Sequence, residues 1–239
     1  MKVGKNMIKK ILFTLILILL PFKTSAQTYN LEDLNLSIAF DDDWYVFTRQ
    51  NIYGNTILKD YGLTEKYMEN LFRNYDIYID ALPKDFELEF FLRLKNVNNV
   101  NNLSNYSDDV VSEIALEVGK EVNTSNYTTY NNKYKYVVFT YQDKGFNILS
   151  YYTIVNRKGY TFSIQKPSEI TEEDKQIMNN IIDSISFKIE EQYREESKTS
   201  HNIIDWNLVL KDALIGGIVG GIIGGTIGLI KYLSKKKNN

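Results

Sequence analysis

The stretch from Ala213 to Ile230 constrains this chain most, because it holds 18 residues without a charged side chain. As a helix it would be about 27 Å long, close to the thickness of the hydrocarbon core of a bilayer. Aromatic and basic residues suited to the membrane interfaces flank it: Trp206, Lys231, Tyr232, Lys235, Lys236 and Lys237. Basic residues stay on the cytoplasmic side. The pattern predicts a transmembrane helix over 213–233 and a cytoplasmic tail over 234–239.

Glycine residues recur through this predicted helix in two adjacent rows: Gly216, Gly217, Gly220, Gly221, Gly224, Gly225 and Gly228. Four residues advance a helix by one turn plus about 40°, so the rows form a slanting groove on one face. In lipid, helices associate through close backbone contact, which small residues permit. The stripe resembles the glycine-zipper membrane helices and predicts pairing with another copy or another transmembrane helix. A lone helix with neutral glycines, and a glycine-rich soluble tail, are the alternatives.

The N-terminal segment has the order of a signal peptide. Lysines at positions 2, 5, 9 and 10 precede an apolar run over 11–22, and Ser25-Ala26 supplies small residues for cleavage. The run is too short to span a bilayer, which favours cleavage over an uncleaved anchor. We therefore expect a signal peptide over 1–26 and a mature N-terminus at Gln27. Both ends then predict a single-pass protein of the bacterial cytoplasmic membrane, with the N-terminal domain outside and the C-terminus in the cytoplasm.

Charge and cysteine content exclude several function classes. Residues 27–210 hold 18 Lys and Arg against 29 Asp and Glu, a net charge of about -11. Binding to nucleic acid needs a cationic surface, so this acidic stretch argues against it. Cysteine is absent, which excludes disulfides, a thiolate nucleophile and a cysteine zinc site. The expected partners are membrane lipid, the chain itself or another transmembrane helix, and an envelope protein or ligand.

Between the two ends, strand patterns occur near the start of the middle region, over 34–48 and 86–95, and again over 134–165. Alternating apolar residues predict strands over 34–40 and 44–48, joined by the turn Asp41-Asp42-Asp43, and a strand over 86–95 with one solvated face. Three further runs, 134–141, 146–155 and 160–165, form a predicted antiparallel meander. Their connections end in Gly145 and Gly159, as a type I turn closed by a left-handed residue requires.

Three helices are predicted between and after these strands. Thr64 and Ser107 are expected N-caps for the first two. Thr171 with Asp174 has the spacing of a capping box before the third. The element order predicts an α+β fold over 27–188, with an antiparallel sheet and helices on both faces in an αβα sandwich. The charged residues of 189–212 then form a stalk and juxtamembrane segment.

The pattern resembles the PsbP-like family. Ser37-Ile38-Ala39-Phe40, which runs through the acidic turn into Trp44-Tyr45-Val46, and the block over 134–185 carry the resemblance. It implies an αβα sandwich of the kind found in photosynthetic lumen proteins and in bacterial extracytoplasmic proteins. Since members of that family act mainly as binding or assembly factors, the resemblance implies no catalytic residues. The family's usual Pro and Gly before the Trp are replaced here by aspartates.

Residues with catalytic or metal-binding potential have ordinary structural interpretations. His201 is the sole histidine and lies in the stalk, so one chain offers no histidine triad and no multi-histidine metal site. Ser163 and Lys166 match S-x-x-K, but at a strand end they are about 10 Å apart. Glu87 and Glu89, about 6.6 Å apart on one side of a strand, suit a glycosidase pair in principle, although a solvated strand face is the commoner cause.

Two further features leave binding open. Asp41, Asp42 and Asp43 are acceptable Ca²⁺ ligands, but a turn explains them without a cation. Five tyrosines are candidates for an aromatic binding face or for ordinary strand residues: Tyr130, Tyr134, Tyr136, Tyr151 and Tyr152. We therefore expect no catalytic residue, no metal and no cofactor. The predicted function is a non-enzymatic binding or assembly module of the cell envelope, with a pore-forming glycine-zipper protein as the alternative and an envelope hydrolase as a distant one.

Overall fold

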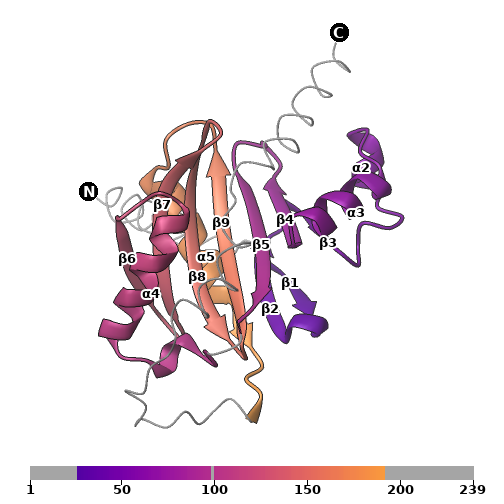
Figure 1. Cartoon of the computed structure of the whole chain (residues 1–239). Coiled ribbons are helices and arrows are strands. Elements are labelled where there is room, and N and C mark those ends of the chain that lie inside the picture. Colours follow the sequence, from indigo (N-terminus) through magenta and orange to yellow (C-terminus); the bar gives the residue numbers. More distant parts are fainter. Residues whose placement is uncertain (1–25, 98–99, 192–239) are drawn as a thin grey trace, which may run out of the picture.

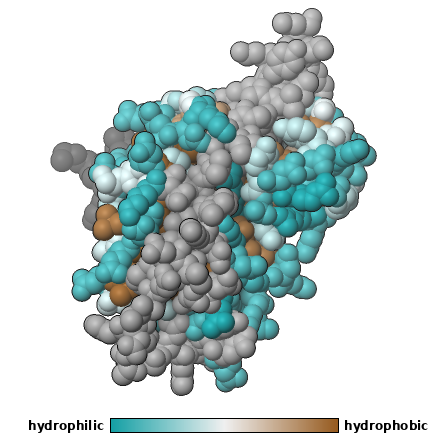
Figure 2. Space-filling view, in the orientation of Figure 1, coloured by the Kyte–Doolittle hydropathy of each residue, from teal (hydrophilic) through white to brown (hydrophobic). Residues whose placement is uncertain are grey.

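The computed structural model describes residues 26–97 and 100–191. The cleavage segment before Ala26, the transmembrane stretch with its glycine stripe and interface residues, the basic tail and His201 lie outside the described residues, so those predictions stay predictions. Among the described residues, no helix is long and apolar enough to cross a membrane. On the face drawn in Figure 2, the surface over α2 and α3 is mainly hydrophilic.

A seven-stranded antiparallel sheet forms the centre of the fold, in the order β3-β4-β5-β9-β8-β7-β6 (Figure 1). Its strands are β3 (Trp44–Thr48), β4 (Ile77–Pro83), β5 (Glu89–Asn96), β6 (Tyr127–Asn131), β7 (Lys135–Asp143), β8 (Phe146–Val155) and β9 (Lys158–Lys166). The predicted meander is confirmed as β7, β8 and β9. The strand predicted over 44–48 is confirmed as β3, whereas β4 and β6 were not predicted.

A second, three-stranded sheet has the order β1-β2-β10, with β1 (Ala26–Leu31), β2 (Leu36–Asp41) and β10 (Ser186–Phe187). The prediction that one sheet holds the strands on either side of the acidic turn is wrong, because β2 lies in this small sheet and β3 in the large one. The turn therefore links two sheets. Leu34 ends a 3-10 helix, Glu32–Leu34, rather than starting a strand.

Helices lie on both faces of the large sheet, which confirms the predicted α+β layers. On one face α5 (Glu172–Ser184) and the small sheet share a single apolar cluster with β3, β4, β5, β7, β8 and β9. On the other face α3 (Glu65–Asn74) packs with the short α2 (Thr56–Asp60) against β3 and β4, and α4 (Asp108–Glu121) packs against β7 and β8. Figure 1 shows α3 and α4 apart from each other. A second 3-10 helix, Leu103–Asn105, precedes α4.

The predicted N-caps differ in how fully they form. The Thr64 hydroxyl accepts a hydrogen bond from the Tyr67 backbone N–H at 3.1 Å. Thr171 and Asp174 form the complete reciprocal capping box. Ser107 occupies the N-cap position of α4, but its side chain makes no capping hydrogen bond. The start of α4 is therefore less well satisfied than that of α5.

The two hairpin turns of the meander are tighter than predicted. Asp143 pairs with Phe146 and Val155 with Lys158, so each turn has only two residues. Both residues of each turn, Lys144-Gly145 and Asn156-Arg157, have positive φ, as in a type I′ turn. Gly159 is a strand residue instead of a turn residue. A Cβ atom there would lie 2.9 Å from the Tyr152 hydroxyl oxygen, so close packing explains this glycine.

Candidate functional site

A groove of about 540 Å³ lies where the small sheet, the start of β3 and α5 meet. Six acidic residues line it: Asp41, Asp43, Asp85, Glu87, Glu173 and Asp174. They come from the acidic turn, from the connection between β4 and β5, and from the first turn of α5. No lysine or arginine is among its lining residues. Because negative charges gathered in one groove make its electrostatic potential more negative, the groove attracts cations.

Apolar side chains form the other part of the groove, including Phe40, Trp44 and Ile177. The Trp44 ring is half-buried and lies 5.5 Å, centroid to centroid, from the buried ring of Phe40. An indole face attracts cations through its quadrupole and also packs against methylene groups. The chemistry of the groove therefore fits a ligand that is both positively charged and partly apolar.

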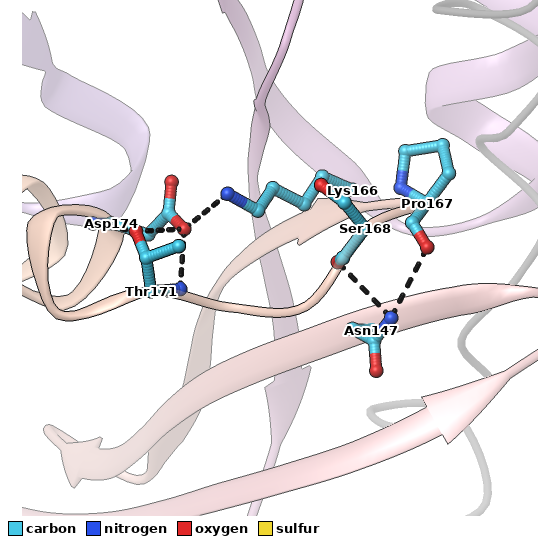
Figure 3. A network of polar contacts seen from close by, with 6 residues as sticks. All are labelled: Asn147, Lys166, Pro167, Ser168, Thr171 and Asp174. Carbon is cyan, nitrogen blue, oxygen red and sulfur yellow. Dashed lines mark hydrogen bonds and ion pairs between the residues drawn. The ribbon is translucent and has the colours of Figure 1, made fainter.

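Asp174 is held by partners within the protein. The Asp174 carboxylate forms an ion pair with Lys166 and accepts hydrogen bonds from the Thr171 N–H at 2.6 Å and hydroxyl at 2.7 Å (Figure 3). Burial alone would raise the pKa of Asp174, but Lys166 and Thr171 outweigh it and hold the pKa below its ordinary value. Asp174 thus fixes the start of α5 rather than facing a ligand.

The same network holds the loop beneath α5. The Asn147 side-chain amide donates to the carbonyls of Pro167 at 3.2 Å and Ser168 at 3.0 Å (Figure 3). These bonds tie the β9–α5 connection to β8. The acidic first turn of α5 therefore stands on a well-anchored loop, which positions Glu173 at the groove.

The structure separates the two predicted catalytic pairs. Glu87 is exposed and lines the groove, whereas Glu89 is fully buried and accepts a hydrogen bond from the Gln165 amide at 2.7 Å. They share no cleft. Ser163 is buried and bonds the Ser150 hydroxyl at 2.7 Å, while Lys166 reaches Asp174 on the side of α5. Neither pair has the arrangement of a glycosidase or a Ser–Lys enzyme.

The acidic turn contributes to the groove without forming a metal cluster. Asp41 and Asp43 line the groove, but Asp42 is not among its lining residues. Within residues 26–97 and 100–191, no group of three or more His, Cys, Asp or Glu side chains is arranged to hold a metal ion. Three of the five candidate tyrosines are core residues: Tyr136, Tyr151 and Tyr152 are at most 4 % exposed. They do not form a binding face.

A buried polar strip, defined by Asp80, Glu89, Arg93, Gln165, Ser163 and Ser150, crosses the middle strands on the face that carries α3 and α4. The sequence predicted a solvated face for β5, which is wrong, because Glu89 is 0 % and Arg93 3 % exposed. Burial raises the pKa of Asp80 to about 7, and burial with the charge of Asp80 raises that of Glu89 strongly. The two carboxyl groups lie within hydrogen-bonding reach of each other, so ionisation of one disfavours ionisation of the other.

Alternation in the sequence could not have separated this strip from a solvated face. Glu87, Glu89, Arg93 and Lys95 alternate with apolar residues, as at the surface of any two-layer fold. The predicted three-layer arrangement could have indicated this burial, because helices on both faces of a sheet leave few solvated positions on a central strand. With α3 and α4 on that face, polar residues of β5 are expected to be buried.

Comparisons with known proteins add little to this geometry. No model of a known protein family matches the chain, and no curated protein matches it in sequence. Among solved structures, the solution structure of cyanobacterial PsbP (CyanoP) from Synechocystis sp. PCC 6803 matches with a TM-score of 0.42 and 10 % sequence identity. The match covers 69 % of this chain and 94 % of that one.

Proposed function

We propose that this chain is a non-enzymatic binding module of the bacterial cell envelope that captures a cationic peptide segment of a partner protein in the acidic groove. The groove carries the proposal, because its lining combines acidic residues besides the paired Asp174 with the half-buried ring of Trp44 in one cavity of about 540 Å³. A lysine or arginine side chain offers both a charge and an apolar stem, so it matches this lining. The separated catalytic pairs support binding over hydrolysis.

Membrane attachment is part of the same proposal. The signal peptide, the stalk and the glycine-striped helix over 213–233 are predicted from the sequence and would hold the domain at the outer surface of the cytoplasmic membrane. Resemblance to the PsbP-like family in the strand pattern supports a binding or assembly role. A tethered domain meets its partner at a raised effective concentration, so a weak electrostatic groove suffices for function.

Trp44 provides a direct test of the groove. The chain has two tryptophans, and Trp206→Phe leaves Trp44 as the single indole. The probe is an oligolysine peptide titrated into this variant, purified full-length in mild detergent. We expect the Trp44 emission to change, with a dissociation constant that rises as salt is added, because the charges are exposed.

A matched pair of variants separates a groove from a generally acidic surface. Asp43→Asn with Glu173→Gln removes two charges from the groove, and Asp109→Asn with Glu113→Gln removes two exposed charges from α4. We expect the first double variant to weaken peptide binding roughly tenfold, the effect of about 1.4 kcal/mol, and the second to leave it nearly unchanged. Equal binding by both, or no response of Trp44, would overturn the proposal.

A further inference from the structure

The edge strands of the two sheets differ in whether side chains hydrogen-bond their outward backbone groups. An edge strand presents unpaired backbone N–H and C=O groups that attract other strands, and proteins usually block them. At β3 the Asn51 side chain does so: its amide donates to the Val46 carbonyl at 2.9 Å, and its oxygen accepts from the Thr48 N–H at 2.6 Å. The chain therefore covers this edge of the large sheet with its own side chain.

The open part of β2 is blocked in a similar way. Beyond the short pairing with β10, the Ala39 N–H donates to the Ser184 hydroxyl at 2.9 Å, and that hydroxyl lies 3.4 Å from the Ala39 carbonyl. Ser184 is the last residue of α5. Two edges are thus closed by side chains that imitate the hydrogen bonds of a missing strand.

The outer edge of β6 has no such cover among the described residues. Within that part of the chain, β7 is the only strand paired with it. Its sequence, Tyr-Thr-Thr-Tyr-Asn, consists mainly of strong strand formers, and Thr128, Thr129 and Asn131 are exposed. Two common protective devices are missing, since residues 122–132 contain neither proline nor any charged residue.

The charge pattern indicates what pairs with this edge. Residues 27–210 carry a net charge of about -11, so two copies repel each other wherever acidic surfaces meet. The run over 122–132 has no charged residue of its own. The Asp183 carboxylate of α5 lies against it and accepts hydrogen bonds from the Tyr130 hydroxyl and the Asn132 amide, each at 2.8 Å, so repulsion between two copies is reduced there rather than absent. A strand without charged residues pairs with an identical strand through backbone hydrogen bonds, and no charge complementarity is required.

We propose that β6 is a self-association edge, at which two copies pair antiparallel through Tyr127–Asn131 and join their large sheets into one. A twofold axis perpendicular to the sheet places Thr128 or Thr129 directly opposite its own counterpart, because opposed residues share a face. It also brings both α4 helices to the same face, where Leu116 is 49 % exposed. The acidic groove lies beside β3 at the other edge and stays open in this dimer.

Cysteine cross-linking tests the pairing in the full-length protein, which has no cysteine of its own. The variants are Thr128→Cys and Thr129→Cys, with Thr140→Cys, an exposed threonine on the neighbouring β7, as the control. A disulfide needs Cα atoms about 4.4–6.8 Å apart, so we expect one of the two β6 variants to cross-link roughly tenfold more than the control under mild oxidant. If neither exceeds the control, the proposal is wrong.

A charge placed on the edge separates stable pairing from random collision. Aspartate is added at the β6 threonine that does not carry the cysteine, which sets like charges close together across the seam. We expect the cross-linked fraction to fall to the level of the control. If the aspartate variant cross-links as strongly as its parent, the contact is collisional and the edge is not an interface. This readout is specific to β6, so association through the predicted glycine stripe does not imitate it.

Discussion

The two faces of the large sheet are built by different means. Against α5, apolar side chains from six strands of the large sheet form one continuous cluster with the small sheet. On the opposite face α3 and α4 cover two separate apolar clusters, and the buried polar strip runs between them. Neighbouring residues of β9 show the contrast: Phe162 belongs to the continuous cluster, and Ser163 to the strip.

The two faces therefore contribute differently to stability and to its dependence on pH. Apolar burial contributes about 25 cal/mol per Å² and has no directional demands, so the α5 face gains its stability from one undivided apolar cluster. Buried polar groups contribute little net stability, and they are costly when their partners are incomplete. In the strip, Glu89 is the group that offers the Asp80 carboxylate a proton, and among the other described residues neither Asp80 oxygen has a hydrogen-bonding donor. The strip makes that face sensitive to protonation.

The largest effect is expected where the continuous cluster is broken. Phe162 is fully buried, and its ring lies 6.3 Å from Tyr136 and 6.2 Å from Tyr160, centroid to centroid. Phe162→Ala should lower the free energy of unfolding by about 3–5 kcal/mol, since it removes an aromatic ring and leaves a cavity. Urea denaturation followed by circular dichroism measures the loss.

Ser163→Ala is the matched variant on the opposite face. It removes one hydroxyl of the 2.7 Å bond to Ser150, while Tyr141 stays 3.4 Å from the Ser150 hydroxyl. We expect a loss of only about 0.5–1.5 kcal/mol. Equal losses in the two variants would show that the faces contribute alike and would contradict the comparison.

The second effect concerns pH and the polar strip. The pKa of Asp80 rises from its unfolded value near 3.9 to about 7 in the native state, because burial disfavours the charged form more than the Glu89 hydrogen bond favours it. A raised native pKa means that stability is greatest below the unfolded pKa and falls as pH rises toward 7. Between pH 4 and pH 8 the wild type should lose roughly 2–4 kcal/mol through this pair.

Asp80→Asn removes one member of the pair while keeping its shape. The variant should be more stable than the wild type at pH 8 and close to it at pH 5, because Glu89 then has no carboxylate beside it. Urea midpoints at both pH values give the comparison. Asp109→Asn, an exposed residue of α4, serves as the control and should keep the wild-type pH dependence. An unchanged pH dependence in Asp80→Asn would place its origin elsewhere.

Local sequence signals predicted the elements that carry them. The meander and the capping box at Thr171 were readable because turn residues and cap spacing act over a few positions. The assignment of β2 and β3 to different sheets could not be predicted in this way, because strand pairing depends on contacts between residues far apart in sequence. β2, for example, pairs with β10, about 150 residues later. The groove depends on the same long-range contacts, which bring Asp43 and Glu173 together.

The smallest expected effect compares the helices on the two faces. At α5 the Thr171 hydroxyl accepts from the Asp174 N–H at 3.2 Å while the Asp174 carboxylate accepts from the Thr171 N–H and hydroxyl. At α4 the Ser107 side chain makes no capping bond. Thr171→Ala should therefore cost about 1 kcal/mol of unfolding free energy, and Ser107→Ala a few tenths at most. Urea midpoints at pH 7 measure both. A larger loss from Ser107→Ala would mean that α4, on the divided face, depends on its cap more than the geometry indicates.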